Sequence, residues 1–295
     1  MSLLNIIILG IVQGLAELLP VSSSAHVVVT EKLLGLDPSS PPMTLLLVML
    51  HTGTMFAVIV YFWRQWWHTY FHSIAAFRRF VVAVVVATAL TGIVGEGLVL
   101  IIQHTVLRGQ PHAQIEDLFG HLEFIAPALA VVGILIVVAG LLERRRAVRA
   151  WPEAADPAET ADLDTRQAGI IGVVQGLSLP FRGFSRSGAT ISTGMLLGVA
   201  KSRAEIFSFA LAVVLTPPVV AREALRLAHA QAAAGGGGLA ALVGRTLFGA
   251  LVAFIAGLFA LKWLSRWLEH GRWHLFGIYC LIAAAAVAVL HHAGY

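Results

Sequence analysis

The stretch GIVQGLAELLPVSSSAH, residues 10–26, interrupts an apolar run with a proline and three consecutive serines. A second stretch, GVVQGLSLPFRGFSRSGAT at residues 172–190, repeats the Gly-x-Val-Gln-Gly-Leu pattern and also continues into a proline and a serine-rich turn. Each stretch predicts two short helices joined by an irregular tip. Irregular backbone at membrane depth is tolerated only where protein buries it or water reaches it. We therefore expect two re-entrant hairpins, at 2–35 and 167–200.

The composition around these stretches is that of an integral membrane protein. Of 295 residues, 58% are hydrophobic and 12% are charged, against about one quarter charged in soluble domains. The net charge of +4 arises from basic residues between apolar runs, so membrane topology explains it better than nucleic-acid binding. Cys280 is the only cysteine, which excludes an intrachain disulfide or a thiolate metal site. The amino-terminal run lacks the features of a removable signal peptide.

Six further apolar runs are long enough to cross a hydrocarbon core of about 30 Å. They predict spans at 43–63, 80–103, 123–142, 204–228, 240–263 and 274–293. The expected fold class is an all-α polytopic membrane protein with six transmembrane helices and two re-entrant helical hairpins.

The order of these segments indicates an internal duplication within one membrane domain. Residues 1–150 would form the first repeat and residues 151–295 the second, each with a hairpin followed by three spans. A hairpin returns to its starting side whereas three spans do not, so the second repeat must enter from the opposite face. This is an inverted repeat, in which a working site is expected where interrupted helices meet near the midplane.

The distribution of basic residues is consistent with this topology. Cytoplasmic loops carry an excess of Lys and Arg, and in the inverted arrangement three connecting loops would share that side. Their basic residues are Arg64, Arg78, Arg79, Arg144, Arg145, Arg146, Arg149, Arg166, Lys262, Arg266 and Arg272. The opposite loops, 104–122 and 229–239, contain only Arg108, although Arg222, Arg226 and Arg245 lie near outer span ends. Both termini are therefore expected outside.

Gln13 and Glu17 are four residues apart and would share one face of a helix. Their side chains offer two oxygen ligands for a hard cation such as Mg²⁺ or Ca²⁺. An ionisable group at this depth is costly unless it meets an ion, a partner or water.

The first tip places hydroxyl groups between Glu17 and a histidine. Ser22, Ser23 and Ser24 occupy the turn and His26 follows it. These residues could carry nucleophilic and acid–base chemistry. A structural alternative is a Pro-Ser turn that caps the second half-helix, with Glu17 reaching toward the interface.

The second tip is rich in groups that bind anions at the start of a half-helix. Its candidate phosphate-binding residues are Arg182, Gly183, Ser185, Arg186, Ser187 and Thr190. Arg can grip phosphate with two prongs, and a helix N-terminus carries partial positive charge. The alternative is a serine cap with an arginine at the interface. If both tips met, they would combine an acid, an imidazole and hydroxyls with a phosphate cradle, which suits phosphoryl transfer.

The motifs QGLAELLPVSSSAH and GFSRSGATIS resemble the two signature motifs of the undecaprenyl-pyrophosphate phosphatases of the bacitracin-resistance type. The resemblance covers essentially the whole chain, including Phe62-Trp63-Arg64 and the run FSFALA at 207–212. It implies hydrolysis of undecaprenyl pyrophosphate to undecaprenyl phosphate and inorganic phosphate, which recycles the carrier for peptidoglycan synthesis. It also implies a divalent metal and a site open to the outer side of the bacterial inner membrane. The implied partners are the lipid substrate and membrane lipids; a homodimer is left open.

Matched to the family residue by residue, Gln13 and Glu17 stand at the acidic pair of the first motif, and Ser23 and His26 at its serine and histidine. The matches in the second motif are Ser185, Arg186, Ser187 and Thr190. Gln13 departs from the acidic form, which leaves Glu17 as the only carboxylate of the pair. The segment 180–183 reads Pro-Phe-Arg-Gly where many relatives have Pro directly before Gly, so Arg182 is an additional candidate phosphate contact.

The expected mechanism has Arg186 and the second tip binding pyrophosphate while Ser23 attacks the terminal phosphorus. His26 would accept the proton, but His26 itself or an activated water could also be the nucleophile. His51, in the first span, would either support the site or pack between helices. A transporter or flippase of the phosphorylated carrier is the leading alternative, because inverted repeats and midplane anion sites are typical of transporters.

Overall fold

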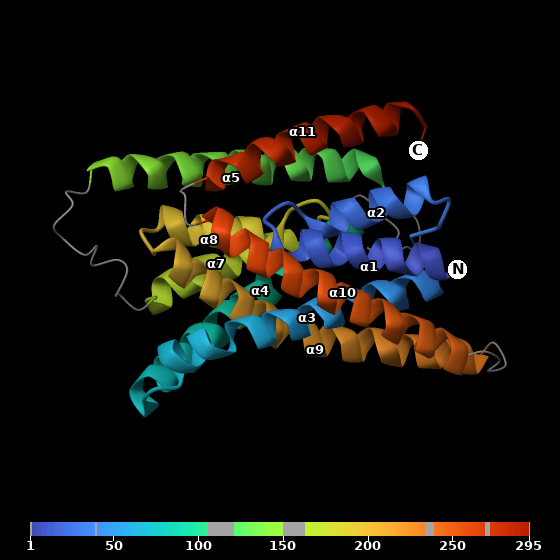
Figure 1. Cartoon of the computed structure of the whole chain (residues 1–295), viewed down its shortest axis with the longest axis horizontal. Coiled ribbons are helices and arrows are strands. Elements are labelled where there is room, and N and C mark those ends of the chain that lie inside the picture. Colours follow the sequence, from blue (N-terminus) through green and yellow to red (C-terminus); the bar gives the residue numbers. More distant parts are fainter. Residues whose placement is uncertain are drawn as a thin grey trace.

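The structure, a computed structural model, describes residues 2–38, 40–105, 121–149, 163–233, 239–268 and 272–294, and every regular element in them is a helix (Figure 1). The helices are α1 (Leu3–Leu18), α2 (Ser23–Leu33), α3 (Pro41–Tyr70), α4 (Ile74–Thr105), α5 (Leu122–Arg149), α7 (Thr165–Ser178), α8 (Arg186–Leu196), α9 (Lys201–Ala233), α10 (Leu239–Leu268) and α11 (Trp273–His292). The order of two short helices and three long ones therefore occurs twice.

Six of these helices are long and apolar enough to cross a membrane, as the sequence predicts. The apolar segments are Pro42–Tyr70, Ile74–Thr105, Leu122–Arg146, Lys201–Arg222, Leu242–Trp263 and Trp273–His292. The fold is that of a polytopic membrane protein.

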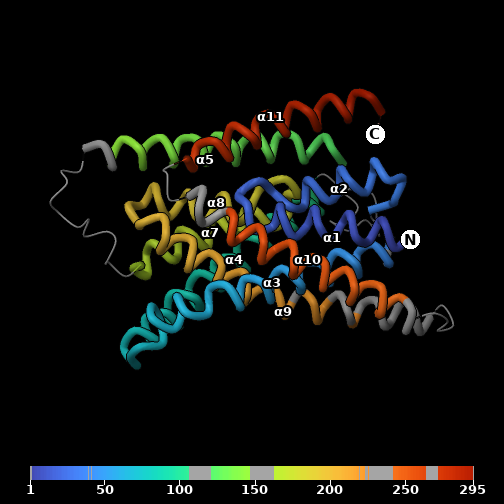
Figure 2. Tube along the Cα trace, viewed as in Figure 1, coloured from blue at the N-terminus to red at the C-terminus, as the bar shows by residue number. Residues whose placement is uncertain are grey.

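The short helices lie in the interior of the helix bundle. Figures 1 and 2 show α5 and α11 side by side along one long edge, with α3, α4 and α9 along the opposite edge. Helices α1, α2, α7 and α8 lie between these two layers, and α10 packs against both α1 and α3. The central position of the short helices gives their irregular tips protein neighbours instead of lipid.

The repeated Gly-x-Val-Gln-Gly-Leu pattern is explained by close helix packing. Gly10 and Gly14 of α1 face α10, and a Cβ atom added at Gly14 would lie 2.5 Å from the Cβ of Ala256. Gly172 and Gly176 of α7 face α4, where a Cβ at Gly172 would lie 2.3 Å from the carbonyl oxygen of Ala87. Small residues four apart allow membrane helices to approach closely and gain van der Waals contact. Each glycine pair thus docks one short helix on one long helix.

The two tips contact each other directly. The backbone N–H of Gly183 donates to Ser24 Oγ at 3.3 Å, and Ser187 Oγ donates to the carbonyl of Leu19 at 3.4 Å. Gly183 has φ +103°, a conformation that favours glycine, and a Cβ there would lie 2.6 Å from the carbonyl of Ile125. Segments some 160 residues apart are therefore fixed against each other.

Candidate active site

The two tips enclose a cavity of about 350 Å³, which lies within the range of small-molecule sites. Its polar lining consists of Glu17, Ser22, Ser23, Ser24, Thr44, His51, Thr54, Ser178, Arg182, Ser185, Arg186, Ser187 and Thr216. Helices α3 and α9 supply most of the remaining wall. Residues expected from both sequence motifs therefore meet in one space.

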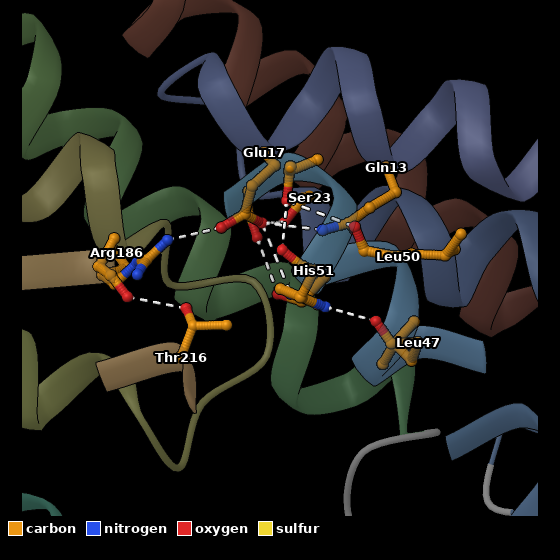
Figure 3. A network of polar contacts seen from close by, with 12 residues as sticks. Gln13, Glu17, Ser23, Leu47, Leu50, His51, Arg186 and Thr216 are labelled. Atoms are coloured by element: carbon orange, nitrogen blue, oxygen red, sulfur yellow. Dashed lines mark hydrogen bonds and ion pairs between the residues drawn. The ribbon is translucent and has the colours of Figure 1, made fainter. Parts of the chain in front are cut away.

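Glu17, in the last turn of α1, is the centre of the polar network (Figure 3). Ser23 Oγ donates a hydrogen bond to its Oε2 atom, and Gln13 Nε2 donates to the same oxygen at 3.1 Å. Its other oxygen, Oε1, pairs with Arg186 Nη2 at 2.5 Å. The side chain of Glu17 is only 11% exposed, so these partners replace water around the carboxylate. Because they come from α1, α2 and α8, the network requires the tips to be docked.

His51 of α3 also faces Glu17, with 3.5 Å between its Nε2 atom and Oε2 of the carboxylate. Its Nδ1 atom lies 2.8 Å from the carbonyl oxygen of Leu47 (Figure 3). A carbonyl only accepts hydrogen bonds, so Nδ1 carries a hydrogen and Nε2 is the nitrogen presented to the cavity. Of the two readings left open by the sequence, the geometry supports a place for His51 in the site.

Two helix N-termini open onto the cavity. Helix α2 begins at Ser23 with Ser22 as its cap, and α8 begins at Arg186 with Ser185 as its cap. Ser22 Oγ accepts from the N–H of Ala25 at 3.5 Å, and Ser185 Oγ accepts from the N–H of Gly188 at 3.1 Å. Both ends carry partial positive charge. Together with Arg186, these ends give the cavity features that favour an anion.

Arg182 lines the same cavity one turn before the start of α8. Its positive charge attracts the carboxylate of Glu31 on α2, which is only 1% exposed. This attraction acts between the two hairpins, in addition to the ion pair formed by Glu17 and Arg186.

Some predicted site residues lie behind the cavity wall. Thr190 is fully buried and its Oγ1 atom bonds to Ser208 Oγ at 2.6 Å and to the carbonyl of Arg186 at 2.8 Å. Gly183 contributes its backbone turn and its bond to Ser24. These residues shape the start of α8 but do not line the space where a phosphate would bind.

His26 is not among the cavity-lining residues. Its Nδ1 atom lies 2.7 Å from the carbonyl oxygen of Ser22, and its Nε2 atom lies 2.6 Å from the hydroxyl of Tyr279 on α11. The expectation that Glu17, His26 and Arg186 face one cavity therefore holds for Glu17 and Arg186 only. The reason is a partner on α11 that lies 253 residues away in the chain.

The sequence motifs did not indicate the apolar part of the wall. Met55 and Val58 of α3, Phe184 of the second tip, and Phe209 and Val213 of α9 all line the cavity. Two signals were available in α9: the FSFALA run, and a threonine followed by two prolines at 216–218 in an otherwise apolar segment. The cavity thus combines a polar end with an apolar wall.

The oxygen atoms beside Glu17 fit a divalent cation in part. Gln13 is fully buried, and its Oε1 atom has no hydrogen-bond partner in the described part of the chain. A buried carbonyl oxygen left unpaired beside a carboxylate is suited to a hard cation. No group of three or more His, Cys, Asp or Glu side chains that could hold a metal occurs among the described residues. Water or substrate oxygens would have to complete the coordination.

Comparison with known proteins gives one family. The family model described as bacitracin resistance protein BacA matches residues 6–286. The chain is 53% identical to undecaprenyl-diphosphatase 2 of Acinetobacter baylyi over 293 residues, which cover 98% of both proteins. It is 32% identical to the undecaprenyl-diphosphatase of Acidiphilium cryptum, with 98% of both chains covered. It is 33% identical to that of Korarchaeum cryptofilum, with 98% of this chain and 100% of the relative covered.

Proposed function

The chain belongs to the bacitracin resistance protein BacA family, and on that premise we propose that it is an undecaprenyl-diphosphatase. The reaction converts undecaprenyl diphosphate and water into undecaprenyl phosphate and inorganic phosphate. One observation carries the chemistry: Glu17 joins Ser23 of the first tip to Arg186 of the second inside a partly apolar cavity. The hydroxyl of Ser23, the carboxylate of Glu17 as a base and the phosphate-binding guanidinium of Arg186 are thereby brought together.

The substrate fits the two ends of this cavity. Its diphosphate would lie against the N-termini of α2 and α8, where Arg186 and Arg182 offset negative charge. Ser185 and Ser187 add hydroxyl donors on the same wall. The isoprenoid chain would follow the apolar residues of α3 and α9.

Ser23 is the nucleophile in our mechanism and Glu17 is its base. Ser23 Oγ attacks the terminal phosphorus, its proton passes to Glu17, and the bond from phosphorus to the bridging oxygen breaks. Undecaprenyl phosphate leaves with the electron pair of that bond. Glu17 passes its proton to the departing undecaprenyl phosphate. Water then attacks the phosphoserine, and Glu17 accepts the proton of the water and returns it to Ser23 Oγ as the bond from serine to phosphorus breaks and inorganic phosphate is released. Arg186 stabilises the charge on the transferred phosphoryl group in both steps.

A divalent cation, Mg²⁺ or Ca²⁺, would be held by Glu17 and by the unpaired Oε1 atom of Gln13. When bound, it would offset the negative charge of the diphosphate and orient its oxygens. Gln13 also donates to Glu17, so it positions the carboxylate whether or not a cation is present.

We further propose that the chain is an inverted repeat of 1–150 and 151–295 with two re-entrant hairpins. The repeated order of short and long helices supports this arrangement, as does the docking of α1 on α10 and of α7 on α4 by equivalent glycine pairs. The site would then open to the outer side of the membrane. The described chain supplies both tips, so a homodimer would not be needed to complete the site.

The test is phosphate release from undecaprenyl diphosphate by the purified protein in detergent. Detergent leaves no compartments, so a carrier that only moves the phosphorylated lipid would release no phosphate, whereas the enzyme turns over. Brief reaction with substrate labelled at the terminal phosphate, quenched in parallel in acid, which preserves phosphoserine, and in alkaline denaturant, which preserves phosphohistidine, identifies the nucleophile by peptide mapping. We expect the label on Ser23; label on His26, or none under single-turnover conditions, would favour the histidine or water as nucleophile.

A further inference from the structure

The backbone immediately before the proposed nucleophile is in an unusual conformation. Ser22 has φ +68°, and it is the only non-glycine residue with positive φ in the described parts of the chain. A left-handed conformation is unfavourable for an L-residue and persists only where its surroundings enforce it. The turn at Ser22 directs the start of α2 and therefore sets the position of Ser23 relative to Glu17.

His26 supplies two contacts to the carbonyl of this turn, in addition to the cap bond from Ala25. The carbonyl oxygen of Ser22 lies 3.3 Å from the backbone nitrogen of His26 and 2.7 Å from the Nδ1 atom of its ring. Because a carbonyl only accepts, Nδ1 carries the hydrogen. In the neutral ring, Nε2 is then an acceptor, and the hydroxyl of Tyr279 donates to it at 2.6 Å. Both ring nitrogens are therefore engaged outside the cavity.

Tyr279 connects this tip to a different layer of the molecule. It belongs to α11, which packs along α5 and also contributes Ala284 and Val287 to a core cluster with Ala25 and Val28 of the first hairpin. Its ring is stacked on that of His26, with centroids 5.6 Å apart and planes inclined by 10°. The neighbouring Cys280 places its sulfur 3.5 Å from the carbonyl oxygen of Pro20. Two consecutive residues of α11 thus contact opposite sides of the turn.

We propose that Tyr279 is a positioning residue for the phosphatase reaction, which acts through His26 to hold the left-handed turn at Ser22 and so to aim Ser23 at Glu17. The inference rests on the function proposed above. It gives His26 a positioning role in place of the proton transfer expected from the sequence. The carboxylate of Glu17, already bonded to the hydroxyl of Ser23, takes the proton.

Substitutions at position 26 separate the two roles of its ring. An asparagine amide can place an N–H near the position of Nδ1, whereas a glutamine amide extends toward the position of Nε2. His26→Asn should retain the bond to Ser22 without an imidazole base, and His26→Gln should lose it. If His26 positions the turn, His26→Asn loses only the contact with Tyr279 and kcat falls roughly tenfold, whereas His26→Gln also loses the bond to Ser22 and kcat falls on the order of 10²-fold, the cost of misplacing a reacting group. Equal inactivity of both variants would show that the imidazole itself is required.

Tyr279→Phe removes only the hydroxyl, and Tyr70→Phe is its control, since Tyr70 stacks on Phe80 away from the cavity. We expect Tyr279→Phe to lower kcat roughly tenfold with KM little changed, because the phosphate-binding groups stay in place. Adding it to His26→Asn should cause little further loss, since the shared contact is already gone. Unchanged kcat in Tyr279→Phe would overturn the proposal.

A second readout does not depend on turnover. Side-chain ¹⁵N spectra of histidine-labelled protein, with the His26 signals assigned by their loss in His26→Asn, report which ring nitrogen carries hydrogen. We expect the Nδ1–H form in the wild type and altered ring shifts in Tyr279→Phe but not in Tyr70→Phe. A wild type that releases no phosphate would refute the proposed function. A His26 ring protonated on Nε2 alone, or unaffected by Tyr279→Phe, would refute this inference whatever the activity.

Discussion

Glu17 contacts more side chains of the site than any of its neighbours does. These contacts compensate the negative charge of its buried carboxylate. Its Oε1 atom pairs with the guanidinium of Arg186, and its Oε2 atom accepts hydrogen bonds from Ser23 and Gln13. A buried ion pair is costly to break on one side, because the remaining charge is left without a partner. In the free site Arg186 is therefore held by Glu17, and a bound phosphate would share that guanidinium.

The geometry of Arg186 should matter as well as its charge. In Arg186→Lys a single ammonium group replaces a planar fork that can contact a carboxylate and a phosphate together. We expect kcat/KM to fall on the order of 10²–10³-fold, as when a donor to transition-state charge is removed. Steady-state phosphate release at several lipid concentrations measures the effect. Near-normal turnover would mean that only the charge is needed there.

Gln13 and Glu17 allow a test of the proposed metal. Glu17→Gln should lower kcat by about 10³-fold or more, because it removes both the base and the only formal negative charge beside the cation. Gln13→Glu should act differently. It adds a ligand charge, so half-maximal rate should be reached at a lower concentration of Mg²⁺ or Ca²⁺, with near-native turnover at saturation.

The measurement is the rate as a function of metal concentration for the wild type and both variants. Direct binding of Ca²⁺ to the purified proteins provides a readout that does not need turnover. If Glu17→Gln leaves metal binding unchanged, Glu17 is not a metal ligand. If Gln13→Glu leaves the metal dependence unchanged, position 13 acts only on the carboxylate.

The sequence predicted the residues of the polar centre because each lies beside an interruption of an apolar run. Glu17 and Ser23 flank the first interruption and Arg186 follows the second, so two docked tips must bring them together. It could not predict the direction of His26. From its position on α2, that side chain could point toward the cavity or toward α11. The packing of α11 determines which of the two it contacts.

At the scale of the helices, the six spans were predicted correctly in number and order but too short at several ends. The second span was expected at 80–103, whereas α4 begins at Ile74 and includes Arg78 and Arg79. Hydropathy marks the apolar core of a span, but the backbone continues its helical hydrogen bonds into the interface. Charged residues can extend toward water from such an end. Apolar windows alone therefore underestimate helix length.

The glycine pairs of α1 and α7 provide a test of how the short helices are held. Gly172→Ala would place a Cβ 2.3 Å from the carbonyl oxygen of Ala87, so α7 and α4 must separate. We expect a loss of about 1–3 kcal/mol of stability, as for overpacked cores. Gly92→Ala on α4 is the matched control, because a Cβ there meets nothing within 4 Å. Thermal unfolding in detergent should show a lower midpoint for Gly172→Ala only. Equal midpoints would argue against close packing at this face.

At the scale of the whole molecule, the two hairpins carry different chemistry despite their common pattern. Gln13 donates to Glu17, while its counterpart Gln175 donates to Thr91 of α4 at 3.1 Å. Thr91 in turn bonds to the carbonyl of Gly172 at 2.9 Å. The first glutamine thus belongs to the site and the second to a packing contact. A duplicated sequence can predict a duplicated scaffold, but each copy must be examined for its own side-chain partners.

The orientation of the protein in the membrane can be inferred from the helix ends and chain termini that lie at the same end of the molecule. In Figure 1 both termini lie at the right, and the end of α3, the start of α4 and the end of α5 lie at the left. Arg78 and Arg79 lie near the start of α4, and residues 144–146 lie near the end of α5. The positive-inside rule then predicts that this end lies in the cytoplasm and that both termini lie outside.

Labelling of one introduced cysteine at a time tests this orientation in intact cells. The native Cys280 is fully buried, so the wild type serves as the unlabelled control. His72 and Ala293 are exposed at opposite ends of the molecule and can be replaced one at a time. A membrane-impermeant maleimide should label Ala293→Cys directly, and His72→Cys only after the cells are permeabilised. Both variants must first release phosphate in detergent, which shows that they are folded. The reverse labelling pattern would place the carboxyl terminus in the cytoplasm. Labelling of both positions from outside would contradict three membrane crossings in each repeat, because α11 and the helices around residue 72 would then end on one side.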